Sequence, residues 1–230
     1  MSTPTQVRSA SRNGVVVTLD GPSGTGKSST ARGVARKLGL RYLDTGAQFR
    51  ALTLWMLEHR IDVNDPARVA LHSEIARIES VTDPNNPAIL LDGRDVSKQI
   101  RSQEVTTAVS PVAAVPAIRD RLLRLQRELI AGGGIVVEGR DIGSVVWPQA
   151  EVKIYLTADP QARARRRSRE AGSDLAATEA DLLRRDEHDS GREAAPLVIP
   201  DGAVHLDTTP YSLPEVIDKV VALVTELQDG

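Results

Sequence analysis

A phosphate-loop motif near the start of the chain limits the possible folds more than any other stretch. It has the pattern G-x-x-x-x-G-K-[ST] and reads Gly21-Pro22-Ser23-Gly24-Thr25-Gly26-Lys27-Ser28. The apolar, β-branched segment 15–19 before it predicts a buried strand, and the spacing of apolar residues after it predicts a helix that Gly39 ends. Strand, loop and helix therefore follow in the order that a nucleotide site requires, and the alternative is a glycine-rich turn before an ordinary helix.

The motif also assigns chemistry to its residues. The glycines allow the backbone to curl so that successive N–H groups point inward, and the positive end of the helix dipole adds to them. We expect Lys27 to reach the β- and γ-phosphates of ATP and Ser28 to ligate Mg²⁺. The predicted ATP-binding residues are Gly21, Pro22, Ser23, Gly24, Thr25, Gly26, Lys27, Ser28 and Ser29.

Composition excludes several classes of protein. The 230 residues include no cysteine, so a disulfide framework and thiolate chemistry are excluded. A net charge of -2 and 3% aromatic residues argue against a surface built for nucleic acid. No segment resembles a membrane span or a secretory signal, and we expect a cytoplasmic monomer with neither membrane nor nucleic-acid partners. The acid-poor residues 1–13 predict a flexible tail, with a transit peptide as the weaker alternative.

The order of apolar segments predicts an α/β fold. Five short apolar strands alternate with helices, which indicates a P-loop NTPase-type five-stranded parallel sheet with helices on both faces. The strands are expected at 15–19, 40–43, 135–137, 152–156 and 203–206. Segments 78–81 and 88–91 flank a turn-rich Asp83-Pro84-Asn85-Asn86-Pro87, which predicts a hairpin in a small antiparallel insertion.

These patterns divide residues 14–230 into one phosphate-loop domain with two additions. We expect the core at 14–60, 130–160 and 195–230, an inserted lobe that is positioned to cover a substrate at about 61–129, and a mobile helical lid at about 161–194. Within the insertion, Ile118, Leu122, Leu125 and Leu129 predict the apolar face of one helix. A capping box at Ser212 begins the last helix.

Basic residues gather between the fourth and fifth strands. Five arginines stand within residues 163–169, and on a helix Arg163, Arg166 and Arg167 share one face. A solvated helix face, a nucleic-acid patch and a lid that neutralises a transferring phosphoryl group all account for such a run. Beside a phosphate loop we favour the lid.

Other arginines lie at expected strand ends or on one helix face. Arg50 and Arg140 follow strand ends, where open α/β sheets bind ligands. Arg185, Asp189 and Arg192 follow the i, i+4, i+7 spacing, which a surface ion-pair ladder would also explain. Several arginines suit an acceptor that carries a dianionic phosphate, because each guanidinium can donate two parallel hydrogen bonds to phosphate oxygens.

Five segments in order resemble bacterial cytidylate kinase over about residues 15–225. The first is the phosphate loop, and Arg185-x-x-x-Asp189-x-x-Arg192 is the last. Between them stand Leu43-Asp44-Thr45-Gly46-Ala47-Gln48-Phe49-Arg50, Ile100-Arg101-Ser102-Gln103-Glu104-Val105 and Gly139-Arg140-Asp141-Ile142-Gly143. The loop alone is generic, and the ordered series is specific.

The resemblance implies an ATP-dependent kinase that converts CMP and dCMP to their diphosphates. It implies that Arg50, Arg140 and Arg192 bind the CMP phosphate and that Arg185 and Asp189 contact the sugar. It further implies that Ser110, Arg119 and Asp141 bind the cytosine, and that Thr45 stands where relatives often have serine. Lys27, Arg140, Arg163, Arg166 and Arg192 would support the transfer itself.

Two rival functions use the same loop. Another small-molecule kinase, such as an adenylate or shikimate kinase, would lack the cytosine-reading residues. A nucleotide-dependent switch or a nucleic-acid-binding NTPase would turn the arginine run toward a polyanion and would show strongly salt-dependent binding.

Overall fold

The computed structural model describes residues 14–172, 174–190 and 198–229. Its core is a parallel sheet of five strands in the order β2-β6-β1-β7-β8, so the expected parallel sheet is confirmed. The strands are β1 (Val16–Asp20), β2 (Arg41–Asp44), β6 (Ile135–Glu138), β7 (Val152–Thr157) and β8 (Val204–Asp207). Central β1 pairs with β6 and β7, which places the carboxyl ends of all three at one edge.

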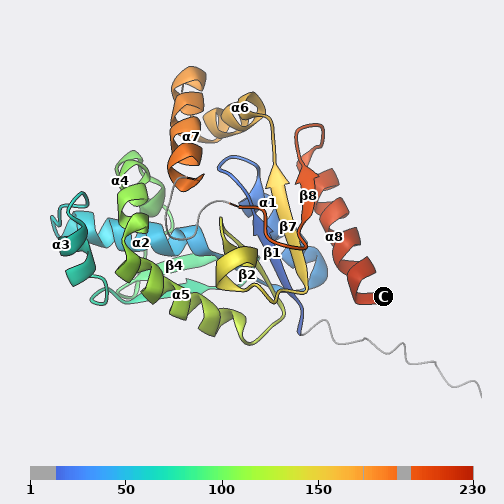
Figure 1. Cartoon of the computed structure of the whole chain (residues 1–230), viewed down its shortest axis with the longest axis horizontal. Helices are drawn as coiled ribbons and strands as arrows, with labels where there is room; N and C mark the ends of the chain where they lie inside the picture. The colour runs from blue at the N-terminus through green and yellow to red at the C-terminus, as the bar shows by residue number, and fades with distance from the viewer. Residues whose placement is uncertain (1–13, 173, 191–197, 230) are drawn as a thin grey trace, which may run out of the picture.

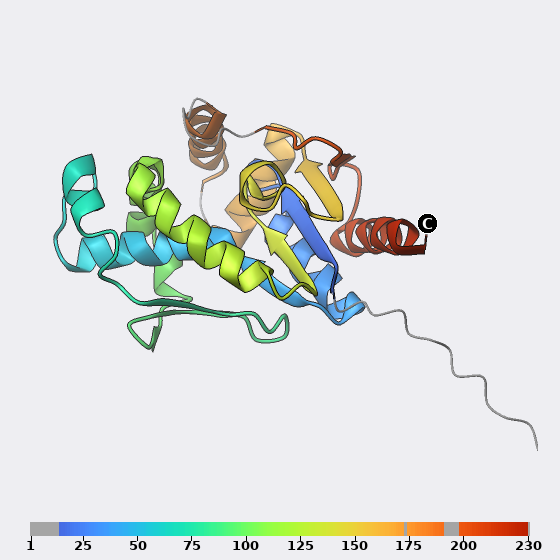
Figure 2. The same cartoon turned by 60° about the horizontal axis from the view of Figure 1, so that its bottom comes forward.

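Helices cover both faces of this sheet, and the two-residue period of β1 shows how. Val17 and Leu19 face α1 (Lys27–Leu38) and α8 (Leu213–Asp229), where they join a cluster with Val34 and Val220. Val16 points to the opposite face, toward α5 (Pro116–Ile130) and η3, a π-helical turn at Ile142–Val146. Figure 2 shows α8 lying along one side of the sheet.

The segment between β2 and β6 has a hydrophobic core of its own. It contains the antiparallel sheet β3-β4-β5, which confirms the expected hairpin and adds a short third strand. Within this segment, helix α2 (Thr45–Glu58; Figure 1) contributes residues such as Trp55 and Met56 to that core. The elements of this segment are α2 (Thr45–Glu58), α3 (Pro66–Leu71), β3 (Ile78–Val81), β4 (Ala88–Leu91), β5 (Arg94–Asp95), η2 (Gln99–Arg101), α4 (Gln103–Ala114) and α5.

The predicted apolar face of α5 is confirmed, and the face is wider than the sequence predicted. Ile118 and Leu122 are buried, and Leu125 and Leu129 are partly buried against the hydrophobic clusters. Gln126 and Ile130 are buried as well, and Gln126 has a buried partner because its Nε2 donates to Gln48 Oε1 at 3.1 Å.

Local signals account for the helix ends. Gly39 ends α1 in the left-handed conformation, as the sequence predicted. The Asp44 side chain accepts from the Ala47 N–H and so begins α2 at Thr45. The predicted capping box at α8 is present, since Glu215 Oε2 accepts from the Ser212 N–H at 2.7 Å.

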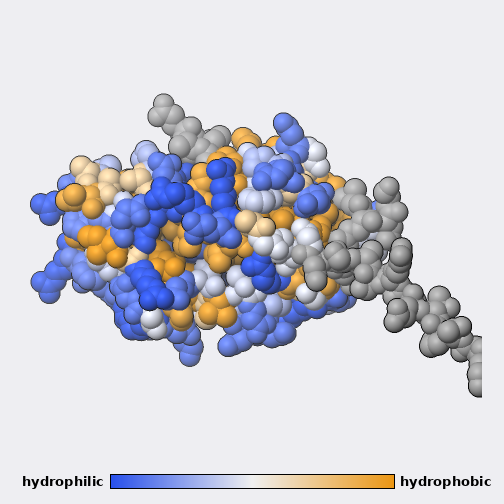
Figure 3. Space-filling model, turned by 90° about the horizontal axis from the view of Figure 1, so that it is seen from below, coloured by the Kyte–Doolittle hydropathy of each residue, from blue (hydrophilic) through white to orange (hydrophobic). Residues whose placement is uncertain are grey.

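Two further helices, α6 (Pro160–Ala171) and α7 (Leu175–Ser190), pack together above the carboxyl edge of the sheet (Figure 1). Hydrophilic and hydrophobic residues mix in small groups on the face seen in Figure 3. Among the helices of the described residues, none combines the length and apolar character needed to cross a membrane.

Candidate functional site

The phosphate loop joins the buried end of β1 to the first turn of α1. Its glycines at 21, 24 and 26 all have positive φ, which an L side chain rarely adopts. Gly21 is under the tightest constraint, because a Cβ there would lie 2.1 Å from the Leu156 carbonyl oxygen. The sequence therefore folds this stretch into a curled loop that leads directly into the helix N-terminus, where anions are favoured.

Lys27 is a nearly buried cation at the start of α1. Its Nζ donates to the Pro22 carbonyl oxygen at 2.6 Å. Burial, together with the neighbouring Arg140 guanidinium, lowers the pKa of Lys27 to about 8. Phosphate oxygens placed beside this amine would favour its charged form, so the site gains an interaction when a polyphosphate binds.

Ser28 belongs to a short chain of hydrogen bonds that ends inside the protein. Its Oγ donates to Glu138 Oε2 at 2.9 Å, and Tyr42 Oη donates to Glu138 Oε1 at 2.5 Å. Glu138 is buried at the end of β6, and burial together with the Asp44 carboxylate raises its pKa to about 7. Hydroxyl and carboxylate oxygens side by side are the ligands that a hard divalent cation accepts.

Asp20 is a second buried carboxylate, at the end of β1. It accepts from the backbone N–H groups of Ile142 and Gly143 at 2.8 and 2.7 Å, and so fixes the start of η3. Burial raises the pKa of Asp20 to about 6, although those two N–H groups act in the opposite direction.

Arg119 and Asp141, which the family resemblance assigns to the cytosine, form an ion pair with each other. Arg119 comes from α5 and Asp141 follows β6, and both side chains are mostly buried. The guanidinium of Arg119 also lies 5.7 Å from the centre of the Phe49 ring. Ser110 lines the same cavity from α4. A planar cation, a carboxylate and an aromatic face together suit a flat polar ring.

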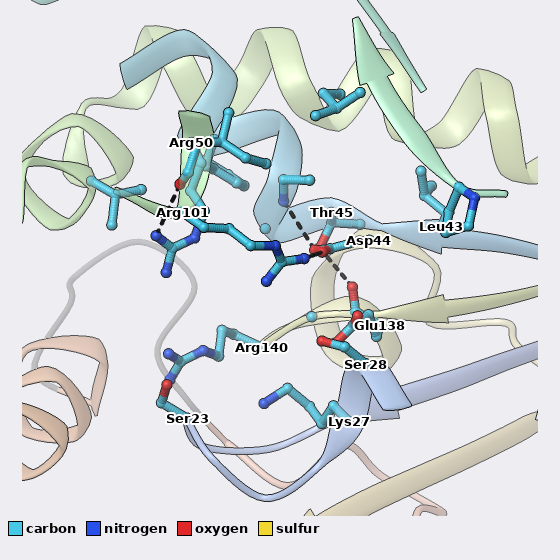
Figure 4. A pocket seen from close by; sticks show the side chains of 18 of the residues that line it. Ser23, Lys27, Ser28, Leu43, Asp44, Thr45, Arg50, Arg101, Glu138 and Arg140 are labelled. Carbon is cyan, nitrogen blue, oxygen red and sulfur yellow. Dashed lines mark hydrogen bonds and ion pairs between the residues drawn. The ribbon is translucent and has the colours of Figure 1, made fainter. Parts of the chain in front are cut away.

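Arg50 and Thr45 are held by the protein around the start of α2. Arg50 Nη1 donates to Thr106 Oγ1 at 3.0 Å, while Thr45 Oγ1 donates to the Glu138 carbonyl oxygen at 2.8 Å. Arg140 follows β6 and lies 3.9 Å from Asp186. Figure 4 shows the charged ends of Arg50, Arg140 and Lys27 turned toward one space.

Arginines of α6 contact the phosphate loop or line the cavity beside it. Arg163 is buried, donates to the Ser23 carbonyl oxygen at 3.1 Å and forms an ion pair with Asp186 of α7. Arg166 Nη2 donates to the Thr208 carbonyl oxygen at 2.7 Å. Arg166 and Arg167 line the cavity. The sequence predicted that these arginines lie on one face of a helix, and in α6 they all lie near the phosphate loop.

One cavity of about 620 Å³ connects these groups. Of the residues that the sequence analysis assigned to the site, it is lined by Ser23, Gly24, Gly26, Lys27, Ser28, Ser29, Thr45, Arg50, Ser110, Arg119, Arg140, Asp141, Arg166 and Arg167. Arg185 and Asp189 lie in α7, and the structure describes only their backbone. Arg192 lies outside the described residues.

Sequence reasoning gave no role to three acidic residues near the site. Asp20 and Glu138 each end a parallel strand, and this position was an available signal. Asp186 gave no such signal, because only the packing of α7 against α6 brings it between Arg163 and Arg140.

The sequence matches known proteins over most of its length. A family model described as cytidylate kinase matches residues 17–226. The chain is 56% identical to a cytidylate kinase of Streptomyces griseus over 216 residues, which cover 93% of this chain and 94% of the relative. It is 54% identical to a cytidylate kinase of Streptomyces avermitilis, over 92% of this chain and 93% of the relative.

Among solved structures, a protein from Eubacterium ventriosum has a similar fold. Its TM-score is 0.50 with 10% sequence identity, and the match covers 92% of this chain and 98% of that chain. At this identity the likeness concerns the fold alone.

Proposed function

The chain belongs to the cytidylate kinase family, and from this premise we propose how the residues around its cavity perform the reaction. The enzyme transfers the γ-phosphoryl group of ATP to the phosphate of CMP or dCMP, and so forms ADP and a cytidine diphosphate. The observation that carries the assignment of residues is that one cavity is lined by both Lys27 and the Arg119–Asp141 pair.

In this proposal the donor nucleotide binds at the phosphate loop. Backbone N–H groups of the loop and the Lys27 ammonium bind the phosphates, and Arg166 and Arg167 approach them from α6. Arg163 acts on the loop itself through its bond to the Ser23 carbonyl oxygen. Closure of α6 and α7 as a lid would exclude water, so that hydrolysis of ATP does not compete with transfer.

Mg²⁺ fits the oxygen atoms beside the loop. In the described part of the chain, no group of three or more histidine and acidic side chains is placed to hold a metal ion. The neighbouring Ser28 hydroxyl and Glu138 carboxylate would hold such an ion through their oxygen atoms, which are the type of ligand that Mg²⁺ prefers. When bound, the ion supplies positive charge that stabilises the transferring phosphoryl group.

The acceptor occupies the other end of the cavity. Arg50 and Arg140 bind its phosphate, with Arg192 as a third arginine, and Ser110, Arg119 and Asp141 bind the cytosine. Arg185 and Asp189 contact the sugar, and Thr45 stands beside the acceptor, with its hydroxyl bonded to the Glu138 carbonyl oxygen. The acceptor phosphate has a second pKa of about 6 and is largely ionised near pH 7, so no protein base is needed. Catalysis then comes from holding the two phosphates in line and from stabilising the negative charge of the transferring phosphoryl group.

The proposed cytosine site would distinguish cytosine from uracil. An ionised Asp141 accepts a hydrogen bond from the amino group of cytosine, and Arg119 donates to ring acceptors. Uracil has a carbonyl in place of that amino group, which would place two acceptors against each other. We therefore expect CMP to be preferred over UMP.

An acceptor panel tests the function. ADP release from Mg-ATP is measured with CMP, dCMP, UMP, AMP, GMP and shikimate in turn, for the wild type and for an Arg119→Gln variant. CMP and dCMP should be the good acceptors, and Arg119→Gln should lower kcat/KM for both. Arg124→Gln is the matched control, because Arg124 lies on the same helix but is exposed and pairs with Glu74.

The panel also separates the rivals. A preference for AMP or shikimate would assign another small-molecule kinase. ADP release that nucleic acid stimulates and CMP does not would refute the proposal in favour of a nucleic-acid-dependent NTPase.

A further inference from the structure

The segment Ile100-Arg101-Ser102-Gln103-Glu104-Val105 has no role in the function described above, although the sequence sets it apart. The structure shows what it holds in place. Ile100 is 1% exposed and anchors η2 in the core of the inserted segment. The Ser102 Oγ accepts from the Val105 N–H at 3.3 Å and begins α4. Between these two fixed points Arg101 lines the cavity, with 57% of its side chain exposed.

The same segment fixes an arginine that the proposed function places on the acceptor phosphate. Arg50 Nη1 donates to Thr106 Oγ1 at 3.0 Å and lies 3.5 Å from the Ile100 carbonyl oxygen. The stretch 100–106 therefore carries Arg101 and also contacts the Arg50 side chain. Figure 4 shows that both turn toward the space faced by Arg140 and Lys27.

Arg101 is held weakly where it stands. Its Nη2 lies 3.6 Å from Asp44 Oδ2, which is longer than a hydrogen bond. The other Asp44 oxygen already accepts from the Ala47 N–H at 2.9 Å as the cap of α2. Asp44 is 22% exposed and Arg101 is 57% exposed, so water reaches the guanidinium and screens this long ion pair, which therefore contributes little. A dianionic phosphate offers the guanidinium two oxygens in the geometry that it binds best.

We propose that Arg101 is a further binding residue for the phosphate of the nucleoside monophosphate, and that it leaves Asp44 when this ligand binds. The proposal rests on the proposed function, because it takes the acceptor site to be the one that Arg50 and Arg140 face. Arg101 extends from the inserted segment, so its contact would connect that segment to the group that accepts the phosphoryl.

The test compares ligands with and without the phosphate. Affinities for CMP and for cytidine are measured by calorimetry on the wild type and on Arg101→Gln, together with kcat and both KM values. Arg101→Gln should weaken CMP binding about 10-fold and leave cytidine binding unchanged within about twofold. KM for CMP should rise by a similar factor, while KM for ATP stays unchanged.

Two variants accompany the test. Arg101→Lys keeps the positive charge but cannot donate two parallel hydrogen bonds, so its affinity for CMP should lie between those of the wild type and Arg101→Gln. Arg94→Gln is the matched control, since Arg94 is an exposed arginine of the same inserted segment that pairs with Glu58. It should bind both ligands as the wild type does.

The outcomes separate the proposal from its alternatives. Equal weakening of CMP and cytidine in Arg101→Gln would mean that Arg101 contacts the base or sugar, or only supports Asp44, and would overturn the proposal. Unchanged CMP binding would overturn it as well. A wild type that binds CMP but does not phosphorylate it would refute the proposed function and leave the binding comparison intact.

Discussion

Replacement of Asp141 by asparagine tests the proposed cytosine site most directly. Asp141 is 11% exposed and its partner Arg119 is 14% exposed, so both charges are largely removed from water. Loss of one partner of a buried ion pair costs about 3–5 kcal/mol. The asparagine would keep one acceptor for Arg119, and some solvent reaches the pair. We therefore expect the free energy of unfolding to fall by about 1–3 kcal/mol, measured by urea denaturation.

The same variant should also change the preference between acceptors, an effect that is more specific to the cytosine site than the loss of stability. An asparagine can present either its oxygen to the amino group of cytosine or its NH₂ group to the carbonyl of uracil. A base contact of this kind discriminates by about 1–3 kcal/mol, which is about 5- to 150-fold. The ratio of kcat/KM for CMP to that for UMP should fall by this factor in Asp141→Asn.

A double-mutant cycle with Arg119→Gln shows whether the pair acts as one unit. Residues in one ion pair usually give interaction energies of about 0.5–3 kcal/mol. A CMP:UMP ratio in Asp141→Asn that matches the wild type would refute the proposed reading of cytosine, even if the protein were less stable.

Three further predictions concern the phosphate loop and its neighbours. Gly21→Ala should lower the free energy of unfolding by about 3 kcal/mol or more, because its Cβ would lie 2.1 Å from the Leu156 carbonyl oxygen at a φ of +138°, and an unchanged urea midpoint would contradict this. The raised pKa of Asp20, about 6, means that the folded protein keeps this proton longer than the unfolded chain, so its stabilising effect is fully present below pH 3.8 and is lost as the pH rises through 6. The free energy of unfolding of the wild type should therefore fall by about 3 kcal/mol relative to Asp20→Asn between about pH 3.5 and 7, and parallel pH profiles would exclude this contribution. The lowered pKa of Lys27 predicts that kcat/KM for ATP declines as the pH rises through about 8, and a flat profile up to about pH 9.5 would argue against a phosphate contact by the charged amine.

Short-range patterns in the sequence sufficed for the elements near the loop. The strand before Gly21, the helix that ends at Gly39 and the hairpin around 83–87 all appear where the sequence predicted them. Backbone conformations that only glycine adopts easily, and the alternation of apolar residues, are properties of a few neighbouring residues. The ordered motifs also sufficed for the family, because they specify a site together.

Tertiary structure decided the contacts between distant segments. It placed β6 between β2 and β1, buried Gln126 against Gln48, and joined Ser28 to Glu138. It also brought Arg101 beside Asp44 from another segment.

The physical reason is that a residue's local pattern does not encode its distant partner. A buried polar group can satisfy itself in several ways, and packing selects one of them. For the same reason the arginines could be proposed as phosphate ligands from the sequence, whereas the carboxylates and carbonyl groups that hold them became visible only in the fold.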